Sequence, residues 1–453
     1  MSDHIHHGVH GCSAEDAYVA PKDPLLQERL SWFQDQKLAL MMHFGIYSQL
    51  GICESWPLSD EDADWSRKAV DWETDSAVFR KQYVDLNRSF HPVRLQPDVW
   101  AQMAKRNGFR YLIFTTKHHD GFCMYDTKWT DYKVTSPDCP FHAHRYADIT
   151  RHVFDAFRAE GIGIAAYFSK PDWHCPWYWA PGQERPIGAW RNPTYDPRQQ
   201  PALWEQYVQF THRQMLELIE RYGRIDILWL DGGQVNPANH QDIRLSEFVA
   251  RARQIQPWLL TADRTVGGEN ENYITPEQSI PDHPIHVPWE SCITIGDAFA
   301  YRYEDTYKSP RTLVHLLIDI VCRGGNLALN IAPQPDGRLP KGAIDSANGL
   351  GDWLRVHGEA IYGTRMCPPY ETGAIAFTRK DKQVYALYRL AQGEPLGRTL
   401  QIPWLERVTR VTLLDGVRPL DFQTSAAGIT IFFPPDVVGT SPLAPAFRLE
   451  NAS

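Results

Sequence analysis

Short apolar segments alternate with amphipathic stretches between about residues 37 and 358. This alternation is typical of a parallel sheet whose strands are joined by crossover helices, and it predicts an α/β fold, a (β/α)8-like barrel of the TIM type. Seven strands can be counted. We expect them at Lys37–His43, Tyr111–Thr116, Gly163–Ser169, Ile225–Leu230, Leu259–Asp263, His286–Trp289 and Asn326–Ile331.

The clearest helix lies between Pro201 and Gly223, where apolar residues recur at a spacing of about 3.6 residues and a glycine then ends the helix. A second helix is expected from Asp148, a candidate N-cap, to Gly161. The same pattern predicts helices at Asp98–Asn107, Ile243–Ile255, Thr312–Cys322 and Ala343–His357.

Beyond Tyr362 the pattern changes to short alternating stretches separated by Gly, Pro and Asp. Examples are Val384–Tyr388, Val408–Leu414 and Gly428–Phe433, which predict a C-terminal antiparallel β-sandwich. The prediction divides the chain into three parts. They are an N-terminal tail of residues 1–30, a catalytic barrel of residues 31–362 and a β-sandwich of residues 363–453.

Composition narrows the function only a little. The formal net charge of −9 gives no basic excess, so we expect neither nucleic acid nor a membrane surface as a partner. Aromatic residues make up 12% of the chain, and such rings pack on sugars as well as in cores. Eight scattered cysteines without zinc-type spacing, and an N-terminus unlike a signal peptide, favour reduced thiols and a cytoplasmic location, or secretion if a signal was removed.

Polar residues follow the predicted strands, at the edge where a β/α barrel carries its chemistry. They are His43; Lys117, His118, His119 and Asp120; Tyr167, with Asp172 and Trp173 beyond; Trp229 and Asp231; Asp263 and Arg264; Trp289 and Glu290; and Asn330. One such residue alone is more often a partner that fixes a loop. Together the seven groups would line one cup with carboxylates, imidazoles and indoles, which suits a small polyhydroxylated ring.

Asp231 and the paired histidines are the sharpest candidates in this set. Asp231 directly follows a buried strand and precedes two glycines that would leave room for a ligand, although an aspartate here could also cap the next turn. His118 and His119 admit a metal site, but neighbours on an extended strand point to opposite faces. We therefore expect no metal and no cofactor.

Six motifs occur in order along the barrel segment. They are KLALMMHFGIYS (37–48), YLIFTTKHHDGF (111–122), YFSKPDW (167–173), ILWLDG (227–232), PWESC (288–292) and GGNLALNIAP (324–333). These motifs resemble glycoside hydrolase family 29, the α-L-fucosidases, and the resemblance extends from about Trp32 to Gly363.

The resemblance implies a retaining exo-α-L-fucosidase with Asp231 as its nucleophile. It leaves two glutamates as acid/base candidates, Glu277 in NYITPEQ and Glu290 in PWESC. We prefer Glu277, because the block Arg264–Gln278 resembles the family branch that presents its acid from a loop at this place, and Glu290 would then help to shape the sugar pocket. Glu277 could otherwise be a solvated loop carboxylate. The acid/base residue should have a raised pKa, whereas Asp231 should be ionised.

The resemblance also assigns fucose-binding roles to His43, Glu54, Trp56, His118, His119, Tyr167, Trp229 and Arg264. One departure is Asp297–Tyr301, where many relatives have Ser-Trp-Gly-Tyr, and it predicts a reshaped aglycone side of the pocket. The segments ESWPLSDED and TPEQ are similar to the branch that cleaves α-1,3- and α-1,4-linked fucose. The expected partner is therefore a fucosylated oligosaccharide or glycoconjugate.

Two other functions are compatible with the same fold. One is a non-catalytic protein that binds fucose or another carbohydrate, which the retained carboxylates argue against. The other is a different exo-glycosidase or a transfucosidase on the same barrel, which product analysis with a glycan acceptor would separate.

Overall fold

The computed structural model describes residues 11–59, 66, 75–182 and 192–451, so residues 1–10 of the predicted tail lie outside it. Seven parallel strands form the first sheet, as predicted. In chain order they are β1 (Leu38–Met42), β2 (Tyr111–Lys117), β3 (Gly163–Ser169), β4 (Ile227–Asp231), β5 (Leu260–Asp263), β6 (Glu290–Thr294) and β7 (Asn326–Asn330). Their order across the sheet is β5-β4-β3-β2-β1-β7-β6.

An irregular segment, residues 271–278, closes the gap between β5 and β6. On one side, Asn272 N–H donates to the Thr261 carbonyl of β5 at 2.9 Å. On the other side, Gln278 N–H donates to the Cys292 carbonyl of β6 at 2.9 Å, and Ile274 and Glu277 form parallel bridges toward Trp289 and Cys292. The segment therefore serves as an eighth strand, and the predicted barrel class is confirmed.

The predicted sixth strand, His286–Trp289, is wrong. β6 begins at Glu290, directly after that segment. The misassigned stretch is apolar enough to suggest a strand, but Pro284 and Pro288 have no N–H to give to a ladder. As a result, Glu290 opens a strand instead of ending one, which places it toward the amino end of the barrel.

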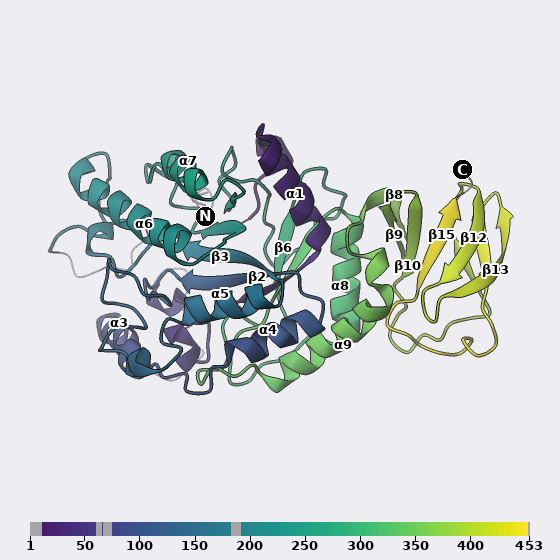
Figure 1. Ribbon diagram of the computed structural model, residues 1–453, viewed down its shortest axis with the longest axis horizontal. Helices are drawn as coiled ribbons and strands as arrows, with labels where there is room; N and C mark the ends of the chain where they lie inside the picture. The colour runs from purple at the N-terminus through teal and green to yellow at the C-terminus, as the bar shows by residue number, and fades with distance from the viewer. Residues whose placement is uncertain (1–10, 60–65, 67–74, 183–191, 452–453) are drawn as a thin grey trace.

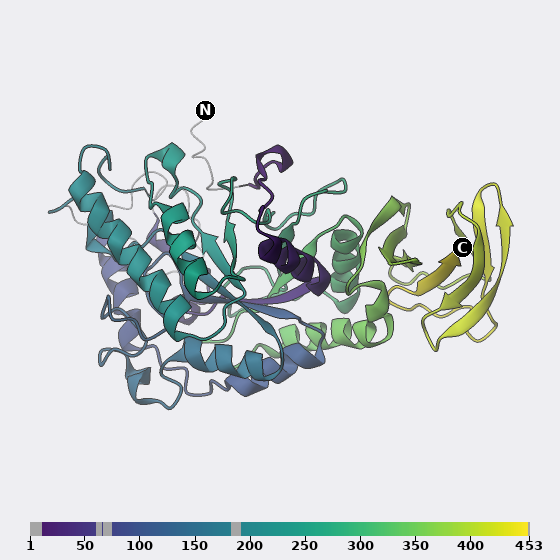
Figure 2. The same ribbon diagram turned by 45° about the horizontal axis from the view of Figure 1, so that its top comes forward.

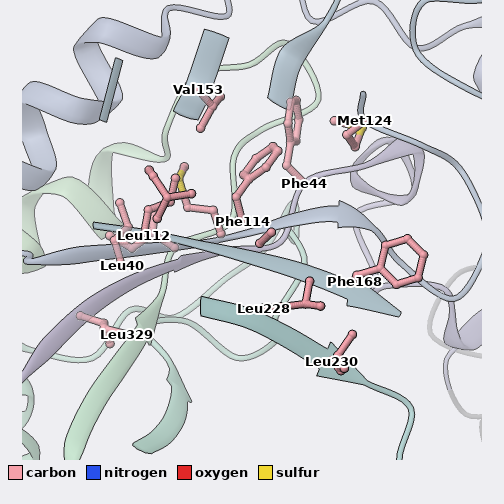
Figure 3. Close-up of a cluster of buried hydrophobic side chains, with 14 of the residues drawn as sticks. Leu40, Phe44, Leu112, Phe114, Met124, Val153, Phe168, Leu228, Leu230 and Leu329 are labelled. Atoms are coloured by element: carbon pink, nitrogen blue, oxygen red, sulfur yellow. The ribbon is translucent and has the colours of Figure 1, made fainter. Parts of the chain in front are cut away.

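Alternation along the strands separates two cores. Inward-facing residues such as Ala39, Tyr111 and Ile227 form the barrel interior, and α1 (Pro24–Gln36) adds Leu26 and Phe33 to the same cluster. The outward-facing side chains pack against the helices, and Figure 3 shows Leu40, Leu112 and Phe114 of the strands together with Val153 of α5 (Ile149–Ala159), which belong to one buried cluster. The strands are buried on both faces, as a parallel barrel requires.

The predicted helices are present around the barrel (Figure 1). They are α4 (Pro97–Arg106), α5 (Ile149–Ala159), α6 (Pro201–Arg221), α7 (Leu245–Ile255), α8 (Pro310–Cys322) and α9 (Lys341–His357). Asp148 caps α5 by accepting the Arg151 N–H, as expected. The sequence analysis did not predict α1 or α3 (Ser76–Val84). No helix in the described ranges is long and apolar enough to cross a membrane.

A second, antiparallel sheet follows the barrel and confirms the predicted C-terminal β-structure (Figure 2). Its strands are β8 (Arg365–Thr372), β9 (Ile375–Lys380), β10 (Gln383–Tyr388), β11 (Thr399–Ile402), β12 (Val408–Leu413), β13 (Arg418–Ser425), β14 (Gly428–Phe432) and β15 (Ala446–Asn451). Helices α8 and α9 join the two parts: Arg311 donates to three carbonyls of the C-terminal part, and Trp353 Nε1 donates to the Ala444 carbonyl at 2.7 Å.

Candidate active site

Side chains from five strand ends converge at the carboxyl end of the barrel. His43 follows β1, His118 follows β2, Tyr167 lies on β3, Asp231 ends β4 and Arg264 follows β5. The side chains are largely buried, although they are polar or charged. Burying polar groups is costly unless they are paired, so the contacts among them define the site.

Arg264 connects the two carboxylates that the sequence suggested for catalysis. Its Nη1 donates to Asp231 Oδ1 at 2.7 Å and its Nη2 donates to Glu277 Oε2 at 2.6 Å. Its Nε donates to the Thr275 hydroxyl at 3.3 Å, and its guanidinium lies 4.4 Å from the centre of the Trp229 ring. The planar guanidinium of Arg264 therefore fixes the positions of Asp231 and Glu277 relative to each other.

The environment of Asp231 favours its ionised form. Burial alone would raise its pKa, but the Arg264 guanidinium, His119 and the Tyr167 hydroxyl together hold the pKa of Asp231 well below its usual range. Tyr167 donates to Asp231 Oδ2 at 2.6 Å, and His119 Nε2 lies 3.7 Å from the same oxygen. Asp231 is thus a deprotonated carboxylate at neutral pH, as a nucleophile must be.

Glu277 differs from Asp231 in its access to solvent. Its side chain is 45% exposed, compared with 19% for Asp231. Glu277 lies on the irregular segment that fills the eighth position of the barrel, two residues after Thr275. This segment was predicted to be a loop. An acid/base group must exchange protons with water during each turnover, and the position of Glu277 allows this.

Gly232, the first glycine after Asp231, does not leave room for a ligand, contrary to the prediction. Gly232 has a φ of +86°, and a Cβ there would fall 2.1 Å from the Cδ of Pro171. The space beside this glycine is therefore filled by protein, not left open for a ligand. A side chain at residue 232 would displace the turn that presents Asp231.

His43 is held as a neutral hydrogen-bond acceptor. Its Nδ1 lies 2.8 Å from Asn330 Oδ1, and the Asn330 amide nitrogen donates to the Phe299 carbonyl at 2.7 Å. Because that amide oxygen must accept, His43 Nδ1 carries the hydrogen and Nε2 has a free lone pair. Burial lowers the pKa of His43 to about 4, so the ring remains neutral at working pH.

The paired histidines, His118 and His119, contact residues of the loop after β1. His118 Nδ1 lies 2.6 Å from the Ser55 hydroxyl, which also accepts the Asp120 N–H at 3.0 Å. The ring of His119 lies 5.3 Å from that of Trp56. Burial, together with the neighbouring His119, holds the pKa of His118 well below its usual range.

Glu54 and Phe299 complete the opposite wall. Glu54 Oε1 accepts the Ala300 N–H at 2.7 Å, and burial raises the pKa of Glu54 to about 7. The Phe299 ring lies 5.0 Å from His43. Phe299 was missing from the residues predicted to bind substrate, although the departure at Asp297–Tyr301 marked its segment.

Glu290 lies below the site, in contrast to its predicted place at a strand end. Its side chain is fully buried, and it accepts Trp229 Nε1 at 2.9 Å and the hydroxyl of Tyr111, the first residue of β2. Trp229 covers it and stacks on Tyr167 at 5.2 Å. Burial raises the pKa of Glu290 to about 7, yet Trp229 separates its carboxyl from Asp231.

Some of the polar residues predicted to line the cup have structural partners instead. Lys117 pairs with Asp172 at 3.0 Å, and Lys170 pairs with Asp263. The Tyr83 hydroxyl donates to Asp120 at 2.8 Å. These buried pairs fix the loops that carry the site, which is the commoner role of a charged residue at a strand end.

Three side chains could in principle hold a metal ion. Within the described part of the chain, His118, His119 and Asp231 offer ligand atoms that lie within 4.8 Å of one another. Arg264 already binds Asp231, however, and its positive charge opposes a second cation at the same carboxylate.

Comparisons with known proteins match most of the chain to one family. A family model described as Alpha-L-fucosidase matches residues 9–359. An alpha-L-fucosidase of Branchiostoma floridae is 26% identical over 92% of each chain, and the tissue alpha-L-fucosidase of Rattus norvegicus is 26% identical over 96% of this chain and 92% of its own. The structure of alpha-L-fucosidase isoenzyme 1 from Paenibacillus thiaminolyticus is similar with a TM-score of 0.77, 27% identity and coverage of 95% and 100%.

Proposed function

This chain belongs to the α-L-fucosidase family of glycoside hydrolases, and we propose that it removes terminal α-L-fucose from oligosaccharides or glycoconjugates by a retaining, double-displacement mechanism. The observation that carries the mechanism is the bridge from Arg264 to Asp231 and Glu277. A retaining enzyme needs a nucleophilic carboxylate and an acid/base carboxyl about 5 to 5.5 Å apart. That one guanidinium binds both carboxyl groups, at 2.7 Å and 2.6 Å, supports this assignment.

In the first step, Asp231 attacks the anomeric carbon of fucose and forms a glycosyl ester. The bond from that carbon to the leaving oxygen breaks, and Glu277 gives its proton to this oxygen. In the second step, Glu277 removes a proton from water, whose oxygen attacks the same carbon and releases Asp231. Each displacement inverts the anomeric centre, so the product retains the α configuration.

Arg264 suits both steps because it serves either carboxylate. While Asp231 is ionised, the guanidinium stabilises its charge. Once Asp231 is an ester, that charge is gone, and the same guanidinium still contacts Glu277, the group that activates water in the second step. Neither step requires Arg264 to move, since both contacts are already formed.

The predicted sugar ligands surround this pair with complementary hydrogen-bonding groups. Neutral His43 offers an acceptor, and neutral Glu54 can donate to a fucose hydroxyl below about pH 7. Tyr167, His118, His119 and Trp56 line the other side. The Phe299 and Trp229 rings provide an apolar surface for the 6-methyl group, whereas a hydroxymethyl group there would lose its hydrogen bonds.

We also propose a preference for α-1,3- and α-1,4-linked fucose. The support is the similarity of the ESWPLSDED and TPEQ segments to that branch of the family. Residues 60–62 of the first segment lie outside the described residues. Release of fucose from α-1,2-, α-1,3/1,4- and α-1,6-linked oligosaccharides at equal concentration would measure the preference, and faster release from another linkage would refute it.

Azide rescue tests the assignment of the two carboxylates. Asp231→Ala, Glu277→Ala and Glu290→Ala are compared with wild type on an aryl α-L-fucoside, with and without azide. We expect Asp231→Ala to give a β-fucosyl azide and Glu277→Ala an α-fucosyl azide, because azide replaces the missing group from opposite faces. If wild type releases no fucose, the chain is a fucose-binding protein, and if it transfers fucose chiefly to a glycan acceptor, it is a transfucosidase.

A further inference from the structure

The N-terminal strap, which we define as residues 12–18, lies against the connection between β5 and β6. Gly268 N–H donates to the Ala17 carbonyl at 3.1 Å, and Tyr18 forms a parallel bridge with Gly268. Ser13 Oγ donates to Glu271 Oε2 at 2.6 Å. The sequence analysis assigned this segment to a tail, yet its contacts cross more than 250 positions of sequence.

Glu271 is the centre of the loop that the strap contacts. Its side chain is only 1% exposed, and its oxygens accept the Thr265 N–H at 3.2 Å and the Gly267 N–H at 2.6 Å. Ser13 supplies its third hydrogen bond. A buried carboxylate depends on such hydrogen-bond donors. Because two of them are backbone N–H groups of the loop of residues 264–270, Glu271 fixes the conformation of that loop.

The loop around Glu271 starts at the residue that organises the active site. Arg264 N–H donates to the Leu230 carbonyl of β4 at 3.2 Å, and this hydrogen bond fixes the backbone of Arg264 at the end of β5. Thr265 follows with a φ of +62°, a left-handed conformation that a β-branched residue rarely adopts. The hydrogen bond from Thr265 N–H to Glu271 holds that conformation and with it the direction in which Arg264 leaves the backbone.

Glu271 also connects the strap to the segment that carries Glu277. It is the first residue of the segment of residues 271–278, where it forms a bridge with Ala262 of β5. Further along this segment, the Thr275 hydroxyl accepts the Nε hydrogen of Arg264 at 3.3 Å, and Glu277 lies two residues beyond. Through Glu271, the strap therefore contacts both backbone segments between which the guanidinium is held.

We propose that Ser13 and Glu271 are positioning residues for Arg264 and that the N-terminal strap is a working part of the active site. The proposal rests on the roles given above to Asp231, Glu277 and Arg264. A displacement of about 1 Å at a catalytic group can cost about 100-fold in rate, so a loop that fixes a shared guanidinium has a large effect on turnover. The strap acts through Glu271 and does not touch the substrate.

Ser13→Ala and Ser13→Thr are the decisive variants, and Glu15→Ala is the matched control. Glu15 lies in the same strap, but it accepts the His286 N–H at 3.1 Å and lies 3.4 Å from His283, away from the Arg264 loop. For each variant, kcat and KM on an aryl α-L-fucoside and the thermal unfolding midpoint are measured. Glu271→Gln is added because it removes the charge and keeps the shape.

We expect Ser13→Ala to lower kcat about tenfold with KM changed less than twofold, since one charge-assisted hydrogen bond is lost. Ser13→Thr should restore kcat to within about threefold of wild type, and Glu271→Gln should lower it by tenfold or more. Glu15→Ala should leave kcat unchanged. A merely structural role would move the unfolding midpoint and leave kcat intact.

Two outcomes would overturn the proposal. One is a wild-type kcat in both Ser13→Ala and Glu271→Gln, and the other is an equal loss of kcat in Glu15→Ala, which would mean that the strap acts only by general docking. Asp231→Ala, measured alongside, separates this failure from failure of the proposed function. If Asp231→Ala is inactive while Ser13→Ala and Glu271→Gln are normal, only the inference about the strap is lost.

Discussion

Replacing Glu290 by glutamine should change the pH dependence of stability and leave catalysis almost intact. The carboxyl group is fully buried and binds Trp229 Nε1 and the Tyr111 hydroxyl. A glutamine has the same shape, accepts from the indole and donates to Tyr111, but it cannot ionise. The substitution therefore isolates the charge of this group from its packing.

The magnitude follows from the pKa of Glu290, which burial raises from 4.5 to about 7. Because the folded protein binds the proton more tightly than the unfolded chain, Glu290 contributes its full stability below pH 4.5 and loses it as pH rises through 7. At about 1.4 kcal/mol for each tenfold difference in proton affinity, the wild type loses about 3 kcal/mol over this range. Glu290→Gln should not show this loss. The similar contribution from Glu54 is present in both proteins and cancels.

The assay compares the thermal unfolding midpoints of wild type and Glu290→Gln at pH 5, 6, 7 and 8. At pH 5 the two should agree, or the wild type should be slightly more stable, and at pH 8 the variant should be the more stable. kcat/KM should remain within about threefold of wild type on both an aryl fucoside and a fucosylated oligosaccharide. Glu290→Leu, which leaves two buried donors without an acceptor, should lower stability by about 2 to 6 kcal/mol at pH 5, where the wild type still has its full stability.

Two results would refute this reasoning. A midpoint difference that stays constant from pH 5 to 8 would mean that Glu290 is ionised throughout. A loss of 100-fold or more in kcat/KM for Glu290→Gln, with α-fucosyl azide formed by Glu290→Ala, would make Glu290 the acid/base and Glu277 a solvated loop carboxylate.

Three further predictions concern the site itself. Arg264→Lys should lower kcat about 100-fold, because an ammonium cannot bridge two carboxylates as the planar guanidinium does. Arg264→Gln, which removes the positive charge that depresses the pKa of Asp231, should also move the acidic limb of the kcat/KM profile to higher pH, and an unmoved limb would contradict this. The inhibition constant of L-fucose should rise about tenfold between pH 6 and 8.5 in wild type, as Glu54 ionises above about pH 7, and should stay flat in Glu54→Gln, whose amide donates at every pH. Dialysis against a chelator should leave kcat unchanged, and a loss that a divalent cation restores would instead support a metal bound by His118, His119 and Asp231.

Much of the barrel could be predicted because its strands are buried on both faces and its helices on one. Such strands appear as short continuous apolar runs, as in β3, and such helices as a period of about 3.6 residues, as in α6. Neither pattern requires knowledge of the partner element. The pattern failed at His286–Trp289, since Pro288 inside the stretch and Pro284 just before it have no backbone donor to give to a strand. It also failed at α1, whose few buried residues lie in a segment of mostly polar sequence.

The sequence pattern could predict site residues only where they lie at the carboxyl end of a regular strand. His43 and His118 follow β1 and β2 and Asp231 ends β4, so the rule for carboxyl ends of strands places them in the same cup. The same rule placed Glu290 wrongly, because one misassigned strand moves a residue from one end of the barrel to the other. Resemblance to the family indicated Glu277, but no periodicity could, since its segment forms isolated bridges instead of a continuous ladder.

The irregularity of that segment explains how the two carboxylates can differ in environment while sharing Arg264. A regular strand ending beside β5 would bury its last side chain as deeply as Asp231, and burial raises the pKa of a carboxyl while removing its contact with water. The segment of residues 271–278 instead leaves Glu277 45% exposed and still within 2.6 Å of the guanidinium. Its shape depends on contacts from β5, β6 and the N-terminal strap, which no local sequence pattern encodes. The proposed roles of Asp231 as a buried nucleophile and Glu277 as an accessible acid/base therefore depend on the place where the barrel departs from regularity.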